Sequence, residues 1–212
     1  MYKHTIKQHY FSLFLVLWPL GITNLKREFE TFLTLNKTKG DLLQMKQRIS
    51  KVLFVSQTAI IAAIYVVITV LFSYISFGVF QVRISEALTL LPVLTPAAIP
   101  GLFIGAFLGN ILGTGNVIDM VFGSLATLIA AILTYRIRCK SRWLAPLPPI
   151  LVNALIIPFV IRYGYGVPVP IPILMLTVGA GQVIACGVLG QLLLKALEKH
   201  KNYINFGYFE PK

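Results

Sequence analysis

The chain has 212 residues, of which 57% are hydrophobic and only 12% are charged, with 19 Lys and Arg against 7 Asp and Glu. A soluble domain carries about a quarter charged residues, so this composition excludes an ordinary soluble enzyme and a disordered chain. Two cysteines, Cys139 and Cys186, are too few for a disulfide framework. The solvent for most of the chain is therefore a lipid bilayer.

The positive charges form three clusters rather than one basic face. Nine lie in residues 1–51, four in 136–142 and four in 195–212. A nucleic-acid-binding domain gathers its Lys and Arg on one surface. Clusters of Lys and Arg that separate apolar runs are instead typical of the loops of a membrane protein.

The N-terminal region differs from the rest of the chain. Residues 10–22 are apolar but too short to span a bilayer, and they lack an ordered signal-peptide cleavage site. We therefore predict that residues 1–45 are an extension, which is either an anchor at the membrane surface or sequence ahead of a natural start at Met45. Residues 46–200 are predicted to form the membrane domain, and 201–212 a cytoplasmic tail.

Apolar runs predict the membrane spans in chain order. The run 52–75 is long enough for one helix. The run 77–113 is too long for one span and contains three prolines, so we predict a helical hairpin that turns near Thr95 and Pro96. Three further spans follow, at 117–135, 144–161 and 171–194.

The hairpin makes six spans, whereas a single kinked helix over 77–113 makes five. With six spans and the N-terminus inside, the cluster 136–142 and the C-terminal tail also lie inside. With five spans both clusters fall outside, against the positive-inside rule. We therefore predict an all-α integral membrane protein, a bundle of six transmembrane helices with both termini in the cytoplasm.

Few side chains within these spans are charged or strongly polar. A charge within a span costs at least about 2–3 kcal/mol and generally marks a ligand site or a pathway. Most of these side chains lie toward the outer side in the six-span topology. We predict that they bind a substrate, with the last two of them deeper in the bundle: Arg83, Glu86, Asn110, Asp119, Asn153 and Gln182.

A purely structural role is the alternative for most of this set. Arg83 and Glu86 are three residues apart, so they can simply pair with each other. The two asparagines and Gln182 can serve only as hydrogen-bonding links between helices, and Arg162 is read as a charge at the membrane boundary. Asp119 has no oppositely charged neighbour in the sequence and is the hardest to explain structurally.

Small residues form two regular stripes. Gly101, Gly105, Gly109 and Gly113 recur every four residues and predict a flat helix face for close packing. Ala59 and Ala63 repeat the same spacing in the first span. They mark either an ordinary internal contact or a face that docks a partner protein.

The sequence lacks the common motifs for nucleotide binding, zinc-dependent proteolysis and serine hydrolase catalysis. It contains no G-x-x-x-x-G-K-[ST], no H-E-x-x-H and no G-x-S-x-G, and its three histidines lie near the ends. We therefore predict no catalytic residues, no metal ligands and no cofactor. The chain is expected to bind a small molecule rather than to convert one.

Two segments carry a resemblance to a known family. The stretch from Gln81 to Leu88, Gln-Val-Arg-Ile-Ser-Glu-Ala-Leu, and that from Thr95 to Gly101, Thr-Pro-Ala-Ala-Ile-Pro-Gly, resemble the QueT family, as does the stretch beginning at Asp119. The resemblance covers about residues 46–196. Its members are substrate-binding S components of energy-coupling factor transporters, assigned to queuosine precursors.

The resemblance implies a fold, partners and a location. It implies six helices, a small-molecule site near the outer face and residence in the bacterial cell membrane. The implied partners are one transmembrane coupling protein and two ATPases, and Ala59 and Ala63 match the motif by which S components dock on the coupling protein. A stand-alone facilitator and a membrane interaction protein are the competing functions.

The chemistry of the implied substrate suggests roles for the polar set. A 7-deazaguanine base presents a ring N–H beside an amine, which one carboxylate of Glu86 or Asp119 can accept together. The other carboxylate can pair with the cation of an aminomethyl form. An amide of the set can meet the base carbonyl, and aromatic rings can stack on the base, for example those of Tyr74, Phe77 and Phe80.

Overall fold

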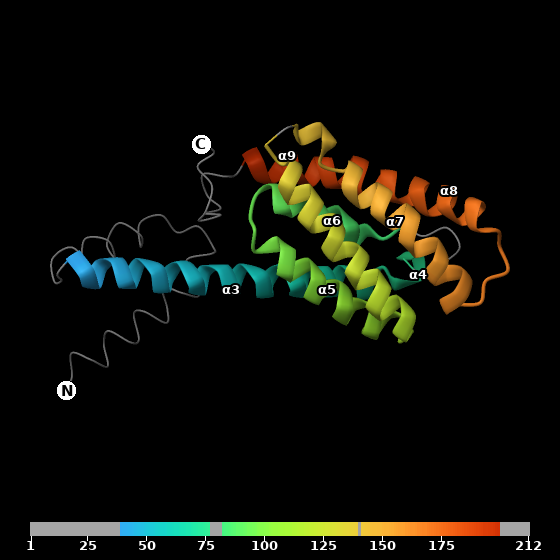
Figure 1. The fold of residues 1–212 in the computed structure, drawn as a ribbon, viewed down its shortest axis with the longest axis horizontal. Coiled ribbons are helices and arrows are strands. Elements are labelled where there is room, and N and C mark those ends of the chain that lie inside the picture. The colour runs from blue at the N-terminus through green and yellow to red at the C-terminus, as the bar shows by residue number, and fades with distance from the viewer. Residues whose placement is uncertain (1–38, 77–81, 140, 200–212) are drawn as a thin grey trace. The chain divides into compact units, whose positions relative to one another are not determined.

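The computed structural model describes residues 39–76, 82–139 and 141–199, and throughout these ranges the elements are helices, with no strand (Figure 1). The predicted segment 10–22, the tail 201–212 and the aromatic residues Phe77 and Phe80 lie outside the described residues. The elements in chain order are α3 (Lys39–Leu71), α4 (Ser73–Ser76), η2 (Ile84–Val93), α5 (Ala98–Gly113), η3 (Asp119–Gly123), α6 (Ser124–Ile137), η4 (Arg142–Leu144), α7 (Leu147–Phe159), η5 (Val160–Gly164), α8 (Ile171–Gln182), η6 (Val183–Gly190) and α9 (Gln191–Lys199).

Residues Thr58–Ala196 form one compact unit, which holds all of the helix packing discussed below. The remaining unit comprises Met1–Gln57 and Leu197–Lys212, and its described residues are helical. Within Thr58–Ala196, α7 packs against both α6 and α8, and α5 packs against α6. The side chains of Ala126, Ile157, Ile161, Leu174 and Val178 form a buried apolar cluster among these helices.

Four helical stretches in the described part of the chain are long and apolar enough to cross a membrane. They are Gln47–Leu71, Asp119–Ile137, Arg142–Gly164 and Ile171–Lys199, and two shorter apolar helices are Ile84–Val93 and Ala98–Gly113. The predicted all-helical membrane fold is confirmed. The number of six spans and the position of both termini inside the cell stay predictions.

The run 77–113 is divided into two helices at the predicted place. In its described part, η2 ends at Val93, the chain turns through residues 94–97, and α5 begins at Ala98. The turn is fixed by backbone hydrogen bonds from Leu94 N to Leu91 O and from Ile99 N to Pro96 O. Because η2 is wound as a 3-10 helix, its 10 residues rise only about 20 Å, less than the hydrocarbon thickness.

The short helix η2 is the innermost element of the unit Thr58–Ala196. Every residue from Ser85 to Pro92 is buried, and η2 packs against α5, α6 and η6. A helix that is buried all round is a core element rather than a lipid-facing one. Its polar residues, which include Glu86, therefore face protein on every side.

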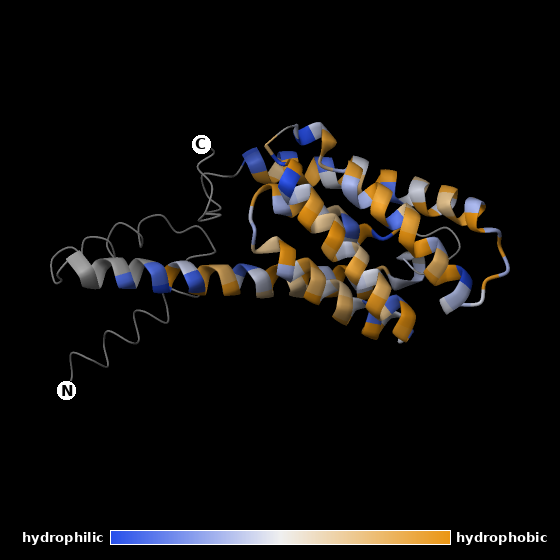
Figure 2. Ribbon diagram, in the orientation of Figure 1, coloured by the Kyte–Doolittle hydropathy of each residue, from blue (hydrophilic) through white to orange (hydrophobic). Residues whose placement is uncertain are grey.

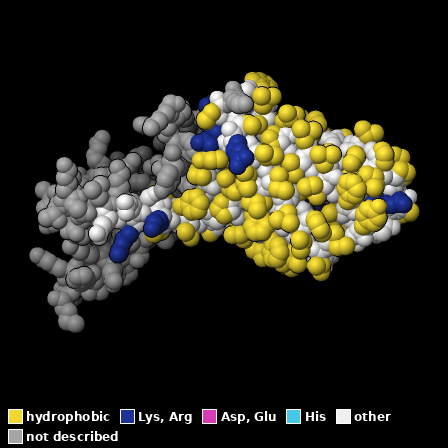
Figure 3. All heavy atoms as spheres, in the orientation of Figure 1, with side chains coloured by type: hydrophobic (Ala, Val, Ile, Leu, Met, Phe, Trp, Pro, Cys, Tyr) yellow, Lys and Arg dark blue, Asp and Glu magenta, His cyan; other side chains and the backbone are white. Residues whose placement is uncertain are grey.

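The long helices are apolar toward the outside and small or polar toward the inside. On α6 the exposed face carries Leu125, Ile129 and Leu133, whereas Ala126 and Thr127 are buried. Figure 2 shows mainly hydrophobic residues along α6, α7 and α8, and Figure 3 shows hydrophobic side chains over most of the visible surface of these helices. Such an apolar exterior suits lipid as the solvent.

The glycine stripe lets α5 lie directly against α3. A Cβ atom added at Gly101 would lie 2.9 Å from the Thr58 carbonyl oxygen, and one at Gly105 would lie 2.8 Å from the Tyr65 Cβ. One at Gly109 would lie 3.2 Å from Thr69. The predicted role of the stripe in close helix packing is confirmed for these three glycines.

This contact predicts a large difference between two Gly→Ala substitutions. Gly105→Ala forces backbone and Cβ atoms apart and is expected to lower the free energy of unfolding by about 1–3 kcal/mol. Gly179→Ala in α8 places a Cβ 3.7 Å from that of Ala154, an ordinary contact, so its stability should stay level or rise slightly. Thermal unfolding of the two purified variants in detergent measures the difference, and equal melting temperatures would contradict the packing role.

The basic cluster and the start of η3 lie at opposite ends of one continuous helix. Asp119 begins the stretch Asp119–Ile137, and Arg136 lies in its last turn. At the same end as Arg136, the Lys195 ammonium lies 5.0 Å from the centre of the Trp143 ring. The polar residues near Asp119 therefore lie at the end of this helix opposite to the basic cluster.

Candidate functional site

Glu86 lies at the point where three long helices meet η2. Its side chain is buried, with 1% of the residue exposed. Oε1 accepts a hydrogen bond from the Tyr65 hydroxyl of α3 at 2.7 Å and from the Thr127 hydroxyl of α6 at 3.4 Å. Oε2 accepts one from the Asn153 amide of α7 at 3.2 Å. We call these four residues the Glu86 cluster.

A second set of contacts ties the backbone of Glu86 to η6. Its carbonyl oxygen accepts the Thr89 hydroxyl at 2.6 Å and the Cys186 thiol at 3.3 Å. The same thiol lies 3.1 Å from Oε1 of Gln182. Gln182 and Cys186 are buried, so the predicted deep glutamine reaches the Glu86 cluster through a cysteine that the sequence did not single out.

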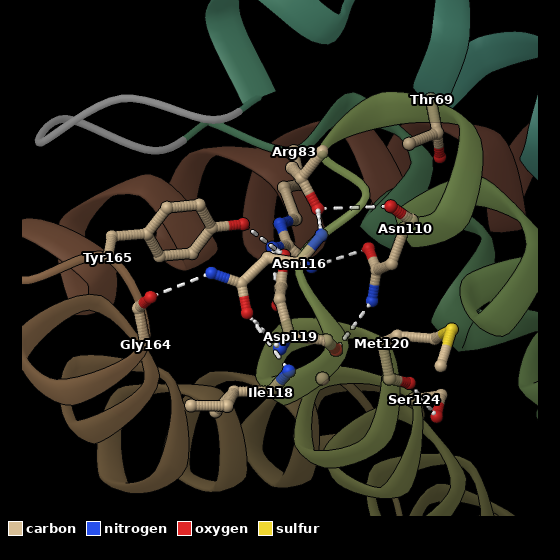
Figure 4. Close-up of polar contacts among 12 residues, drawn as sticks. Thr69, Arg83, Asn110, Asn116, Ile118, Asp119, Met120, Ser124, Gly164 and Tyr165 are labelled. Carbon is tan, nitrogen blue, oxygen red and sulfur yellow. Dashed lines mark hydrogen bonds and ion pairs between the residues drawn. The ribbon is translucent and has the colours of Figure 1, made fainter.

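Arg83 and Asp119 form a buried ion pair (Figure 4). The Nη2 atom of Arg83 lies 3.1 Å from Oδ1 and 2.9 Å from Oδ2 of Asp119, and Nη1 lies 3.4 Å from Oδ1 of Asn110. The Asn110 amide donates in turn to the backbone oxygen of Asp119 at 2.9 Å. These three residues, together with Tyr165, are called the Arg83–Asp119 cluster below.

The alternative in which Arg83 pairs with Glu86 is wrong. Spacing by three residues brings side chains together only when both residues are helical. Arg83 precedes η2 and has an extended backbone, with φ −80° and ψ 98°. Its side chain therefore reaches η3 instead of the helix face that carries Glu86.

The loop that follows η5 closes the Arg83–Asp119 cluster. The Tyr165 hydroxyl donates to Oδ2 of Asp119 at 2.8 Å, and the Asn116 amide donates to the Gly164 oxygen at 2.7 Å. Oδ1 of Asn116 also accepts the backbone N–H of Ile118 at 2.9 Å. Partial burial, with the Asp119 carboxylate adding to it, raises the pKa of Tyr165 to about 12, so the phenol stays a proton donor at neutral pH.

Gly123 leaves room for the ion pair. A Cβ atom at this position would lie 2.7 Å from Oδ1 of Asp119 and 2.8 Å from Nδ2 of Asn110. The glycine is buried in η3, one turn beyond Asp119 on the same helical stretch. Any side chain at this position would displace the carboxylate or the amide.

Wide π-helical turns carry several of these residues. Asp119 and Gly123 lie in η3, and Cys186 lies in η6, while Tyr165 directly follows η5. Segments of π-helix are rare and occur frequently at functional sites. Their extra residue per turn shifts the side chains that follow, which is why an ideal helical wheel does not place these residues together.

Not every predicted residue belongs to the two clusters. Arg162 donates to the Val169 oxygen at 3.0 Å and holds the loop between η5 and α8, in keeping with a charge at the end of a span. Tyr74 is 98% exposed, so its ring does not line the Glu86 cluster. Tyr65, Thr127 and Tyr165 do contribute, although no sequence pattern had indicated them.

The comparisons with known proteins identify the family. A family model described as the QueT transporter matches residues 55–199. This chain belongs to the QueT family. No curated protein and no solved structure matches it. With the long apolar helices, membership makes the chain a multi-pass membrane protein of a transporter family.

The QueT match contains the whole candidate site. Both clusters, together with Ala59 and Ala63, fall inside residues 55–199. The QueT resemblance read from the segments at Gln81, Thr95 and Asp119 is therefore confirmed. Two of those segments contribute Arg83, Glu86 and Asp119 directly to the clusters of this chain.

In this QueT chain the face of α3 that carries the two alanines is not used by α5. Ile61, Ala62 and Tyr65 are buried toward α5, whereas Ala59 and Ala63 are exposed. The glycine contacts described above involve the buried residues. The internal-contact alternative for Ala59 and Ala63 therefore finds no support within the unit Thr58–Ala196.

Proposed function

We propose that this chain is the substrate-binding subunit of an energy-coupling factor importer and captures a queuosine precursor, a 7-deazaguanine base, from outside the cell. Membership of a transporter family supports the transport role. The binding role rests mainly on one observation: the buried carboxylate of Glu86 accepts hydrogen bonds from side chains of three helices. Buried ionisable groups within membrane spans generally mark a ligand site.

The proposal assigns different tasks to the six predicted site residues. Glu86 accepts donor groups of the base, and Asn153 holds that carboxylate in place. Gln182 accepts at Oε1 from Cys186, which leaves its amide N–H groups to meet the base carbonyl. Arg83, Asp119 and Asn110 are bonded to one another, so we assign them to shaping the site rather than to direct contact.

The proposed topology has six passes with both termini in the cytoplasm. The turn at residues 94–97 supports it, since it divides the apolar run into the two short helices η2 and α5. The placement of Arg136 and Asp119 at opposite ends of one helix fits a basic cytoplasmic side and a polar outer side. The ligand then enters from the side of Asp119.

The proposed partners are a transmembrane coupling protein and two ATPases. The exposed small-residue face at Ala59 and Ala63 supports docking on the coupling protein, because small side chains let another helix approach closely. The partners supply ATP hydrolysis, for which this sequence has no P-loop.

Bulky residues at Ala59 and Ala63 are expected to block assembly without harming the ligand site. The double substitution Ala59→Leu and Ala63→Leu should reduce co-purification with the coupling protein and uptake by roughly tenfold or more. Ligand affinity of the isolated subunit should change less than twofold. Ala180→Leu, an equal change at an exposed position of α8, is the matched control. Undiminished assembly of the double variant would refute the docking role.

Native purification followed by mass spectrometry of the bound small molecule tests the proposed function. We expect a 7-deazaguanine base, together with uptake that requires the ATPases. Recovery of an unrelated vitamin would replace the substrate but keep the class. Uptake that persists without the ATPases would instead favour a stand-alone facilitator, and absence of any ligand or uptake would favour an interaction protein.

A further inference from the structure

Basic side chains gather at one end of the unit Thr58–Ala196 without acidic partners in that unit. The acidic residues of the unit are Glu86 and Asp119, which are buried in the two clusters described above. The last turn of α9 adds Glu198 but also Lys199, so it leaves the balance unchanged. We call the basic side chains at this end the basic surface; they come from the end of α6, from η4 and from α9, and they are Arg136, Arg138, Arg142 and Lys195.

Exposed apolar side chains lie directly beside the basic surface. Trp143 follows Arg142 in η4 and is 75% exposed, and Leu144 and Leu147 are exposed as well. The Lys195 ammonium lies 5.0 Å from the centre of the Trp143 ring, a cation–π distance. Figure 3 shows Lys and Arg side chains next to hydrophobic ones at this end of the unit. Tryptophan is enriched where a membrane meets water, because one part of its ring is apolar and its N–H is polar.

Contacts from α6 and α9 hold η4 in position. The Arg142 carbonyl oxygen accepts the Gln191 amide of α9 at 2.9 Å, and the Ala145 carbonyl oxygen accepts the Thr134 hydroxyl of α6 at 3.4 Å. Gln191 and Lys195 are four residues apart and lie on one face of α9. The contact that fixes η4 therefore also brings Lys195 to the exposed ring, so that ring and cations form one preorganised patch.

The ends of two candidate spans place the basic surface at a membrane boundary. The stretch Asp119–Ile137 ends beside Arg138, and the stretch Arg142–Gly164 begins with Arg142 itself. Both stretches are long and apolar enough to cross a bilayer. The basic surface therefore lies at the depth of the phospholipid headgroups, where an anionic membrane surface favours binding of each Lys or Arg roughly fivefold.

We propose that the basic surface and Trp143 bind the headgroup of an anionic phospholipid. The guanidinium and ammonium groups donate to its phosphate oxygens, while the ring and the exposed leucines contact the beginning of its acyl chains. The occupant is a lipid rather than a protein because these apolar side chains stand at the ends of two spans, where lipid is the nearest neighbour. The inference goes beyond the proposed function and is independent of the molecule that is transported.

Quenching of Trp143 fluorescence by brominated phospholipids tests the proposal. Trp18→Phe leaves Trp143 as the sole tryptophan of the full-length chain. The purified chain is placed in phosphatidylcholine bilayers, in which either brominated phosphatidylglycerol, an anionic lipid, or brominated phosphatidylcholine replaces the unbrominated lipid in steps. We expect the anionic lipid to be preferred next to Trp143 by about fivefold or more. Equal quenching by the two lipids would overturn the proposal.

Substitutions at the two ends of one span link the preference to the basic surface. Arg142→Gln combined with Lys195→Gln should bring the preference close to one. Arg162→Gln is the matched control, because Arg162 lies near the opposite end of the stretch Arg142–Gly164, and it should keep the preference. A preference that survives the double substitution, or that the control also loses, contradicts the assignment.

Salt provides a second measurement that needs no change at the basic surface. Raising NaCl from about 0.1 M to about 1 M shortens the Debye length from about 10 Å to about 3 Å, so the preference should fall by half or more. A preference that salt leaves unchanged would contradict headgroup binding. If the preference is absent and the double variant instead loses co-purification with the coupling protein, this surface is a protein interface and the inference is wrong.

Discussion

Replacing Glu86 by Ala is expected to lower ligand affinity by roughly 100-fold or more and to abolish uptake at low substrate concentration. The substitution removes the acceptor toward which Tyr65 and Asn153 point. It also leaves these two donors buried without an acceptor, which costs about 1–3 kcal/mol of stability for each such group. Loss of binding should therefore be accompanied by a lower melting temperature.

Separating the two effects requires a substitution that keeps the packing. Glu86→Gln has nearly the same volume and retains one oxygen acceptor for Tyr65, and Asn153 can turn its amide so that its oxygen accepts from the new –NH2 group. Its melting temperature should therefore lie closer to that of the wild type than that of Glu86→Ala does. Its affinity should still fall strongly. Thr177→Val on α8, which removes a hydroxyl bonded only to the local Leu174 oxygen at 3.1 Å, is the control. Full binding by Glu86→Gln and Glu86→Ala would rule out Glu86 as the ligand-binding carboxylate.

The helical membrane fold could be predicted because its signals are periodic or continuous. Apolar runs of sufficient length mark helices wherever lipid is the solvent. Glycines that repeat every four residues fall on one face of a helix, whichever helix packs against that face. In this structure the helix that packs there is α3. The three prolines located the turn now seen at residues 94–97.

The tight winding of η2 could not be predicted in the same way. Hydropathy alone does not distinguish a 3-10 helix buried among other helices from a longer helix that faces lipid. The elements that bury η2 are distant in the sequence, since η2 packs against α5, α6 and η6. Tertiary contacts therefore determine how deep Glu86 lies.

The charged residues of the two clusters could be singled out in the sequence, but their pairings and their uncharged partners could not. A charged residue in an apolar run is conspicuous by itself, so Arg83, Glu86 and Asp119 could be selected singly. Their partners could not, because a tyrosine or threonine in a membrane helix is common. The spacing of three residues between Arg83 and Glu86 suggested that the two side chains pair on one helix face. Arg83 instead precedes η2 and has an extended backbone.

Breaking the Arg83–Asp119 pair on one side is expected to be more damaging than removing both charges. Asp119→Asn leaves a buried guanidinium without its counter-ion, and Arg83→Gln leaves a buried carboxylate. Either change should lower the free energy of unfolding by about 3–5 kcal/mol. The double substitution removes both uncompensated charges and should be more stable than either single variant.

The stability that the double variant regains over the single variants distinguishes a charge pair from a set of independent hydrogen bonds. For independent contacts the two losses simply add, whereas coupled charges give a double variant that recovers stability. Tyr165→Phe provides the scale for the loss of a neutral donor, because it removes the hydroxyl that donates to Asp119 at 2.8 Å but no charge, and it should cost about 0.5–1.5 kcal/mol. Thermal unfolding of the four variants in one detergent yields the comparison. Losses that add in the double variant would mean that charge balance between Arg83 and Asp119 does not shape this site.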